Sequence, residues 1–298
     1  MFDRVIIATD LSKDSNAILS CIGALKIYGT NKCLLLQSRT AVEIFGMDNT
    51  YKAAVIAGYE ESLKKQKKIL EKQGYDVEVR ILSGSSPNEI NRIAVDENYS
   101  AIVVGAERHS SPEEAYFSDL ANDLIYIAKK PIFLIRLSRL MERLREGLSS
   151  YVEKTGCEIG NHVLFPTDFS ENADVAFAYI SGIIADRAKR VTLLHVQDKA
   201  RISPYLENRI DEFNVIDETR LMNMKKIIQE KGDTEVEAIV KYGSPPVEIL
   251  DFIRKNHVDL VVMGTQGRGL VREFFLGSVS HNIARSSPSS VLLIPTKR

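Results

Sequence analysis

The chain has 298 residues, with 39 Lys and Arg against 40 Asp and Glu, and a formal net charge of −1. This length predicts two domains, and the balanced charge gives no reason to expect a general nucleic-acid-binding protein. Seventeen Gly and nine Pro are too few for a collagen-like or disordered chain. No apolar run reaches the ~18 residues that a membrane helix needs.

The first four residues, MFDR, lead directly into a strand-like stretch. They lack the basic start and the cleavage site of a signal peptide. The three cysteines, Cys21, Cys33 and Cys157, form no CxxC motif and no metal-ligand spacing. These features predict a cytoplasmic protein whose thiols are buried or incidental.

The most informative feature is an internal duplication. Residues 4–10 (RVIIATD) are echoed by residues 162–168 (HVLFPTD), and residues 84–90 (GSSPNEI) are echoed by residues 243–249 (GSPPVEI). Two later blocks repeat in the same way, namely residues 101–105 with 260–264 and residues 132–135 with 291–294. Four separated blocks that keep the same order and nearly the same spacing predict two copies of one domain.

The copies are expected at residues 1–138 and 161–298, and a helical linker is expected between them at residues 139–160. Apolar residues recur in this region at steps of three and four among Arg and Glu: Leu137, Leu140, Met141, Leu144, Leu148, Tyr151 and Val152. This spacing is typical of a one-sided amphipathic helix. Such a helix packs its apolar face on the domains or, as the alternative, binds a partner or a second chain.

The second copy alternates short apolar runs with longer helical patterns. The apolar runs cover residues 162–166, 191–196, 236–240, 260–263 and 291–294. Helical patterns cover residues 174–185 and 206–231, a third helix opens at Pro246, and Ser278 or Ser280 is expected to cap a fourth. Apolar strands joined by helices predict an α/β fold of two tandem doubly wound, Rossmann-like domains. Each is expected to contain a five-stranded parallel sheet flanked by helices.

In a doubly wound domain the ligand binds beyond the carboxyl ends of the strands, where the strand order reverses. Asp168, Val196 and Gly264 end or directly follow predicted strands of the second copy. We therefore expect them at one edge of its sheet. The corresponding residues of the first copy are Asp10, Gln37 and Gly105.

A glycine-rich segment, residues 264–278 (GTQGRGLVREFFLGS), follows the fourth predicted strand of the second copy and ends where a helix begins. Glycine lets the backbone approach an anion closely, and the N–H groups at a helix start carry the positive end of the helix dipole. The segment therefore suits a phosphate-bearing ligand. The alternative is that these glycines are ordinary turn residues.

The pattern G-x2-G-x9-G-S, formed by Gly264, Gly267, Gly277 and Ser278, resembles the ATP-binding signature of the universal stress protein family. The segment PTDFS at residues 166–170 and the closing strand VLLIP resemble the first and last strands of that family. The resemblance covers nearly the whole chain as two tandem family domains, and only the joining helix lies outside it.

The resemblance implies a binding role for each matching residue of the second copy. The residues expected beside adenine and ribose are Pro166, Thr167, Asp168, Val196, Met263 and Gly264. The residues expected around the phosphates are Gln266, Gly267, Gly277, Ser278, Val279 and Ser280. From the residues alone, Asp168 is alternatively a cap for the next helix, and Val196 and Met263 are alternatively plain core.

The first copy departs from the motif. It keeps Gly105 but has Arg108, Ser118 and Asp119 where the second copy has Gly267, Gly277 and Ser278. A carboxylate ~4 Å from a phosphate costs about 4 kcal/mol at an effective dielectric constant of ~20. A micromolar affinity corresponds to only about 8 kcal/mol. We therefore predict that the first copy does not bind ATP in the family manner. Arg108 is expected to pair with Asp119, with a smaller bound anion as the alternative.

The remaining polar candidates are interpreted as structural. His195 is expected to be an ordinary half-buried strand histidine. The acidic pairs at residues 211–212 and 217–218 predict one face of a helix. The other histidines form no metal-ligand set, and these are His109, His162, His257 and His281.

The leading hypothesis is an ATP-binding universal stress protein that acts as a nucleotide-dependent switch or sensor in the stress response. ATP is the expected ligand, with ADP and AMP as alternatives, and Mg²⁺ is expected at the phosphates. Because no residue stands out as a general base for water, no catalytic residue is assigned, and slow ATP hydrolysis is the most that we expect. The alternatives are a hydrolase or adenylyl-transferring enzyme that uses ATP, and a nucleotide-free interaction protein.

The resemblance also implies that the two copies pack as an intramolecular pseudo-dimer, and a homodimer of the whole chain is left open. Neither a membrane nor nucleic acid in general is an expected partner. The sequence names no protein partner and no triggering stress.

Overall fold

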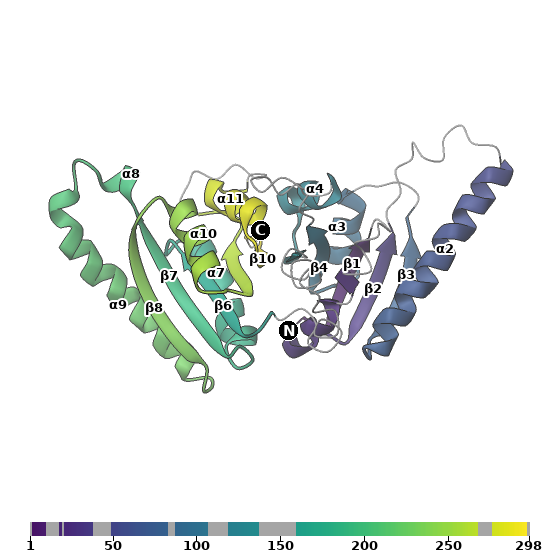
Figure 1. The fold of residues 1–298 in the computed structure, drawn as a ribbon, viewed down its shortest axis with the longest axis horizontal. Helices are drawn as coiled ribbons and strands as arrows, with labels where there is room; N and C mark the ends of the chain where they lie inside the picture. Colours follow the sequence, from purple (N-terminus) through teal and green to yellow (C-terminus); the bar gives the residue numbers. More distant parts are fainter. Residues whose placement is uncertain are drawn as a thin grey trace. The chain divides into compact units, whose positions relative to one another are not determined.

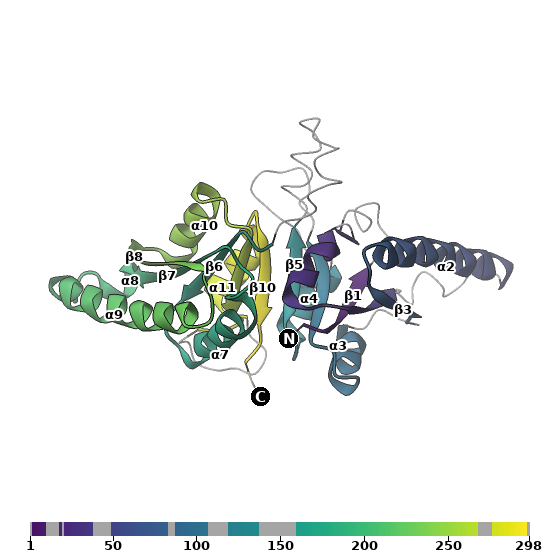
Figure 2. The same cartoon turned by 90° about the horizontal axis from the view of Figure 1, so that it is seen from below.

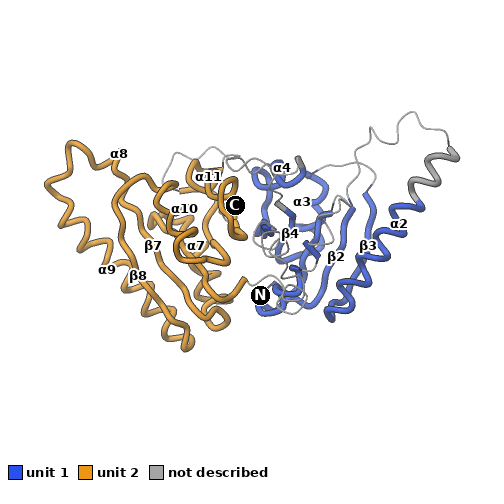
Figure 3. The backbone as a smooth tube through the Cα atoms, viewed as in Figure 1, with its two compact units in different colours: residues 1–111, 115–157 blue, residues 112–114, 158–298 orange. Residues whose placement is uncertain are grey.

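The computed structural model describes residues 2–9, 18–19, 21–37, 49–82, 87–106, 119–136, 159–267 and 276–296. The chain forms two compact units (Figure 3). Unit 1 comprises residues 1–111 and 115–157, and unit 2 comprises residues 112–114 and 158–298. The helix predicted at residues 139–160 lies outside the described residues, except for its last two positions.

Unit 1 alternates strands with helices (Figure 1). Its strands are β1 (Arg4–Thr9), β2 (Lys32–Gln37), β3 (Asp76–Ile81), β4 (Ala101–Ala106) and β5 (Ile132–Arg136). Its described helices are the 3-10 helix η1 (Gly23–Tyr28), α2 (Asn49–Lys72), α3 (Pro87–Asp96) and α4 (Asp119–Ile127). The strands form a parallel sheet in the order β3-β2-β1-β4-β5.

Unit 2 repeats this arrangement. Its strands are β6 (His162–Thr167), β7 (Arg190–Asp198), β8 (Glu235–Gly243), β9 (Leu260–Gly264) and β10 (Ser290–Ile294). Its helices are α7 (Glu171–Tyr179), η3 (Ile180–Ile184), α8 (Lys199–Ile202), η4 (Glu207–Arg209), α9 (Ile210–Gln229), α10 (Pro245–Lys255) and α11 (Ser278–Ser286). The strands are parallel in the order β10-β9-β6-β7-β8, so the predicted fold class is confirmed for both units.

Helices cover both faces of the unit 2 sheet, which explains why its strands are apolar along their whole length. Phe177 of α7 packs on Phe165 of β6, with ring centroids 5.8 Å apart. Phe252 of α10 packs on His162, with centroids 6.3 Å apart. Because residues 162 and 165 of one strand point to opposite faces, α7 and α10 lie on opposite faces. Figure 2 shows α9 and α10 on opposite sides of the same sheet.

Some elements differ from their predicted bounds. The second and third strands of unit 2 are longer than expected, because β7 reaches Asp198 and β8 reaches Gly243. The added residues of β7 and β8 pair with each other through the backbone. Backbone pairing does not require apolar side chains, so the sequence pattern did not indicate these strand ends. The helix expected at residues 174–185 begins earlier, at Glu171, and after Tyr179 it continues as the π-helical turn η3.

The predicted serine cap of the last helix is wrong. Helix α11 begins at Ser278, and Gly277 occupies its N-cap position, where it offers no side chain. The hydroxyl of Ser280 is used elsewhere, since it donates to the main-chain oxygen of Gly264 at 2.8 Å. The helix α11 therefore begins without a capping side chain, and Gly277 occupies the N-cap position.

The cysteines only partly match the expectation. Cys33 is a buried free thiol, and burial raises its pKa to about 12. Cys21 is buried as well, but it is disulfide-bonded and is therefore not one of the free thiols that the sequence predicted. Among the helices that the structure describes, none is long and apolar enough to cross a membrane.

Candidate functional site

The strand order of unit 2 reverses between β6 and β9, which are neighbours in the sheet. Strand β6 ends at Thr167 and is followed by Asp168, while β9 ends at Gly264. Because parallel strands share one carboxyl edge, these residues lie at the edge where ligands bind in doubly wound folds. The predicted placement of Asp168 and Gly264 at one edge follows directly from this topology.

Asp168 stands at the centre of a tight turn between β6 and α7. Its Oδ1 accepts hydrogen bonds from Ser170 N at 3.1 Å and from Ser170 Oγ at 2.6 Å. Ser170 in turn is the N-cap of α7, where its Oγ accepts from Ala173 N at 3.3 Å. Asp168 therefore does not cap the helix itself but holds the residue that does.

The residue after Asp168 has an unusual backbone conformation. Phe169 has a φ of 58°, in the left-handed region that bulky residues rarely adopt. Its N–H donates to Thr167 Oγ1 at 3.0 Å. A strained backbone at a strand end is typical of functional sites, where the surrounding contacts hold it in place.

Gly267 lies directly against this turn. A Cβ atom added to Gly267 would lie 2.6 Å from Asp168 Oδ2, so a larger residue at this position would displace the carboxylate. A Cβ atom on Gly264 would lie 3.0 Å from the main-chain oxygen of Asn172, in the first turn of α7. Glycine at position 264 therefore permits close packing of the helix on the strand, while glycine at position 267 permits close approach of the loop to Asp168.

The start of α11 lies against the same loop. Gly277 N donates to the main-chain oxygen of Thr265 at 2.7 Å. A Cβ atom on Gly277 would meet Gln266 Cα and Gly267 N at 3.4 and 3.5 Å, which are ordinary contacts. With the bond from Ser280 to Gly264, these contacts bring the first turn of α11 and the loop at residues 264–267 together. The first-turn N–H groups of a helix have no partner within the helix, and Gly277 supplies no side chain to cap them.

The structure thus brings together Asp168, Gly264, Gln266, Gly267, Gly277 and Ser280. The buried members of the predicted set are Pro166, Thr167, Val196, Met263, Gly264 and Ser280, whereas Ser278 is exposed. The remaining members are half-buried, namely Asp168, Gln266, Gly267, Gly277 and Val279. Val196 lies within β7 and pairs in register with Lys241. The prediction that Val196 is the last residue of its strand is therefore wrong.

Two residues beside the site, His195 and Asp217, were not among the predicted binding residues. His195 is not half-buried but buried, with 7% of its surface exposed, and its Nδ1 lies 2.8 Å from the main-chain oxygen of Thr167. Asp217 is also buried, whereas Asp211, Glu212 and Glu218, the other members of the predicted acidic helix face, are exposed. The sequence contained a signal for the burial of Asp217, because this residue falls on the same helical stripe as Leu221, Met224 and Ile228.

The corresponding edge of unit 1 is different. A Cβ atom on Gly105 would lie 1.9 Å from Ile18 Cδ1, so the buried Ile18 side chain packs directly on this glycine. The first described residue of helix α4 is Asp119, which the sequence comparison of the two copies aligns with Ser278 of α11. Asp10, Arg108 and Ser118 lie outside the described residues, and so does the expected ion pair between Arg108 and Asp119.

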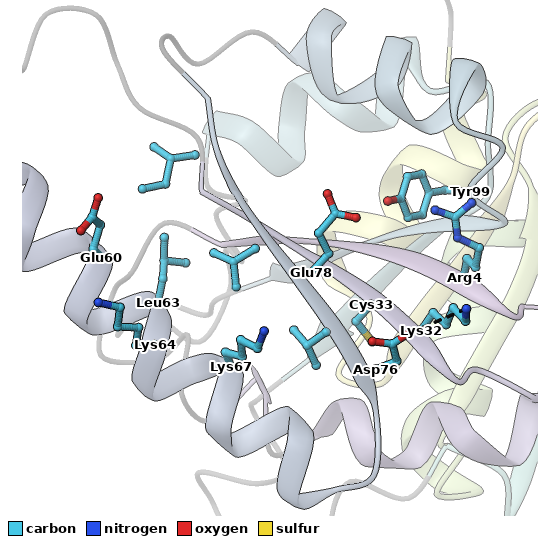
Figure 4. Close-up of a pocket in the computed structure, with 13 residues that line it drawn as sticks. Arg4, Lys32, Cys33, Glu60, Leu63, Lys64, Lys67, Asp76, Glu78 and Tyr99 are labelled. Atoms are coloured by element: carbon cyan, nitrogen blue, oxygen red, sulfur yellow. Dashed lines mark ion pairs between the residues drawn. The ribbon is translucent and has the colours of Figure 1, made fainter.

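Unit 1 also has a cavity of about 780 Å³ along its edge strand β3 (Figure 4). Its lining includes Arg4, Lys32 and Asp76, which are the first residues of β1, β2 and β3. Leu63 and Lys67 of α2 line it as well. The cavity therefore runs along β3 and reaches the amino ends of the strands, so it is not the counterpart of the unit 2 site.

Comparisons with known proteins agree with this architecture. The model of the universal stress protein family matches residues 1–136 and residues 161–295. A universal stress protein of Methanocaldococcus jannaschii is 30% identical over an alignment of 154 residues, which covers 45% of this chain and 94% of that protein. A protein of Staphylococcus aureus strain USA300, named for the same family, is 29% identical over 140 residues, which make up 46% of this chain and 84% of that protein.

The crystal structure of a universal stress protein from Archaeoglobus fulgidus has the same fold, with a TM-score of 0.74 and 21% sequence identity over 99% of both chains. The two segments matched by the family model contain the two parallel sheets described above. The chain therefore belongs to the universal stress protein family, with two tandem family domains.

Proposed function

We propose that unit 2 binds ATP at the carboxyl edge of β6 and β9, and that the protein acts as a nucleotide-dependent switch or sensor in the stress response. One observation carries the proposal. The first turn of α11 begins at a glycine without a capping side chain, and it lies against the loop that contains Gly267 and faces Asp168. Such an uncapped helix start, next to a close-packed glycine loop, is suited to bind phosphate.

Each group has a role in this proposal. The main-chain N–H groups of Gly267, Ser278 and Val279 would donate to the phosphates. The carboxylate of Asp168 would accept hydrogen bonds from the ribose hydroxyls. Val196 and Met263 would offer apolar surface to the adenine. Five other members of the proposed set shape the pocket through the backbone, and these are Pro166, Thr167, Gly264, Gln266 and Gly277.

Ser280 supports the phosphate-binding backbone through its side chain. Its hydroxyl donates to the main-chain oxygen of Gly264, which fixes the first turn of α11 against the end of β9. We therefore propose that Ser280 acts on phosphate only through its N–H group, because its hydroxyl proton is already used. A preorganised set of N–H donors binds an anion without the cost of ordering the loop.

We propose that Mg²⁺ enters the site with the nucleotide. Bound Mg²⁺ would neutralise and orient the phosphate oxygens. Within the described part of the chain, no three His, Cys, Asp or Glu side chains are grouped so that they could hold a metal ion. The phosphate oxygens would be its main ligands in this proposal.

We propose that unit 1 does not bind ATP in this way. Ile18 lies directly on Gly105, so an apolar side chain covers the glycine of unit 1 that corresponds to Gly264. The sequence comparison aligns Asp119, the first described residue of α4, with Ser278 of unit 2. An added negative charge at this helix start would compete with phosphate for the same N–H groups.

The test is a calorimetric titration of nucleotide-stripped protein with ATP and Mg²⁺. In the Gly277→Asp variant, the new carboxylate would cap α11 and lie next to the phosphates. About 4 kcal/mol of repulsion corresponds to a loss of roughly a thousandfold in affinity. The matched control is Gly277→Ala, because the added Cβ makes only ordinary contacts. This control should keep both its fold and its affinity within a few-fold.

The outcomes separate the hypotheses. Loss of binding in Gly277→Asp, with an unchanged melting temperature and with binding retained in Gly277→Ala, supports the proposed phosphate site. Equal affinity of the two variants would show that phosphate binds elsewhere. If the wild-type protein binds no nucleotide at all, the nucleotide-free interaction protein becomes the better account.

A further inference from the structure

A buried polar cluster beside the candidate site has no role in the function proposed above. His195 of β7 and Asp217 of α9 are both buried, and His195 Nε2 lies 3.4 Å from Asp217 Oδ2. The other ring nitrogen of His195, Nδ1, lies 2.8 Å from the main-chain oxygen of Thr167. The ring therefore joins α9 to the turn that carries Asp168.

Both ring nitrogens of His195 face oxygen atoms that can only accept hydrogen bonds. A main-chain carbonyl has no proton to donate, and neither has an ionised carboxylate. A neutral imidazole has one N–H group, so it would leave a ring lone pair against an oxygen atom at either Thr167 or Asp217. The arrangement is therefore satisfied when His195 is an imidazolium and Asp217 is ionised.

His162 provides an internal contrast, because it is also a buried histidine of the same sheet. Its Nδ1 lies 3.0 Å from the main-chain oxygen of Asn256, and its Nε2 lies 2.8 Å from Thr192 Oγ1. A threonine hydroxyl can donate to a bare ring nitrogen. His162 is thus satisfied as a neutral ring, and it serves as the control for His195.

The other groups around Asp217 do not replace the imidazolium. Gln197 Nε2 donates to Asp217 Oδ2 at 3.0 Å, but it carries no charge. Arg220 Nη1 lies 3.9 Å from Asp217 Oδ1, and the side chain of Arg220 is 51% exposed. When His195 loses its proton, Asp217 would keep a buried negative charge with weaker compensation, which is costly in a protein interior.

Further neighbours of the His195 ring come from two other elements beside it. On β8, the residue in register with His195 is Val240, which carries no charge. The turn after β6 contributes the Phe169 ring, whose centroid lies 4.5 Å from that of His195. The same turn contains the carboxylate of Asp168, whose Oδ1 accepts from Ser170.

Phe169 links this pair to the candidate site. Its ring contacts His195, and the guanidinium carbon of Arg220 lies 5.2 Å from its centroid. Its backbone is held at a φ of 58°, which costs free energy unless surrounding contacts compensate. His195 thus contacts both neighbours of Asp168, through the carbonyl group of Thr167 and the ring of Phe169.

We propose that the His195–Asp217 ion pair holds the turn at residues 167–169 in its nucleotide-binding conformation, so that loss of the imidazolium proton weakens nucleotide binding. This inference rests on the proposed function. His195 is a positioning residue in this account, because it acts on the nucleotide through Asp168. The physical link is that a neutral ring cannot bond to Thr167 and Asp217 at the same time.

The first test measures the dissociation constant of ATP with Mg²⁺ between pH 6.5 and 9. We expect the affinity of the wild-type protein to fall about tenfold when the ring loses its proton, which is the scale of one hydrogen bond to a charged group. The control is His162→Gln, which should follow the wild-type profile. The phosphate groups of free ATP titrate in the same way in every experiment. Dividing the dissociation constant of one variant by that of another at the same pH therefore removes the contribution of the ligand.

Two variants distinguish positioning from a merely structural role. His195→Gln cannot carry a charge, so its affinity should be weak and independent of pH relative to the control. Asp217→Asn should keep strong binding at every pH, because an amide can donate to a neutral Nε2 while Nδ1–H stays on Thr167. A merely structural role would weaken both variants equally without flattening the profile.

The second test needs no nucleotide and keeps the inference decidable if His195→Gln does not fold. Ring resonances of the histidines are followed by NMR against pH, and His195 should retain both ring protons to a higher pH than His162. A wild-type protein that binds ATP with a profile parallel to that of His195→Gln would overturn the inference but leave the proposed function intact. Absence of ATP binding by the wild-type protein at every pH would overturn both.

Discussion

At the residue scale, the three motif glycines differ in what a side chain would meet. A Cβ atom on Gly264 would approach backbone, one on Gly267 would approach the carboxylate of Asp168, and one on Gly277 would make only ordinary contacts. The spacing of glycines in a sequence cannot separate these cases, since all three read as turn residues. In the structure, glycine at position 264 allows the first turn of α7 to pack closely on the end of β9.

This difference gives a prediction for Gly267→Ala. The added Cβ must displace Asp168 Oδ2, from which it would lie 2.6 Å. We expect ATP binding to weaken about tenfold, on the scale of one displaced hydrogen-bonding carboxylate. The melting temperature should change little, because Asp168 is half-buried and its carboxylate can rotate.

The matched variant is Gly264→Ala, whose Cβ would lie 3.0 Å from the main-chain oxygen of Asn172. Backbone yields less readily than a carboxylate, so this variant should lower the melting temperature. Calorimetry and thermal unfolding of both proteins provide the comparison. Wild-type ATP affinity in Gly267→Ala would show that Asp168 takes no part in nucleotide binding.

At the scale of elements, the amino ends of β6 and β7 are joined to α10 by His162. Its ring bonds to Thr192 of β7 and to the main chain of Asn256, just after α10. Burial lowers the pKa of His162 below its usual value near 6.5. Near that pH the unfolded chain therefore binds more protons at this residue than the folded chain does.

The sign of the resulting pH dependence follows. The contribution of His162 to the free energy of unfolding is complete above about pH 6.5. It decreases as the pH falls from that value toward the lower pKa of the folded state. The measurement is urea unfolding of the wild-type protein and of His162→Gln at pH 7.5 and at pH 5.5. The wild-type protein should lose more stability on acidification, and equal losses would contradict this assignment.

Element types were predictable from the sequence, but several bounds and contacts were not. Apolar runs marked all five strands of unit 2, because parallel strands are buried on both faces. The extensions of β7 and β8 consist partly of polar residues, and backbone pairing with the neighbouring strand decides their conformation. The partnership of His195 with Asp217 joins residues that are 22 positions apart in the chain and depends on how α9 packs on the sheet.

At the scale of the whole molecule, the duplication predicted most of the fold. Two copies of one strand–helix pattern imply two sheets of the same topology, and both sheets have the corresponding strand order. The sequence also identified the edge at which Asp168 and the glycine loop meet. It did not predict the contact of Ile18 with Gly105, because this contact depends on packing between segments distant in the chain, and it did not predict the disulfide bond of Cys21.

The asymmetry between the two units is the central claim, and a crystal structure determined with excess ATP and Mg²⁺ tests it most directly. We predict one nucleotide per chain, with its phosphates at the first turn of α11 and its ribose beside Asp168. Unit 1 should hold no nucleotide at the start of α4. A nucleotide bound in unit 1, with the edge of β6 and β9 empty, would contradict the account.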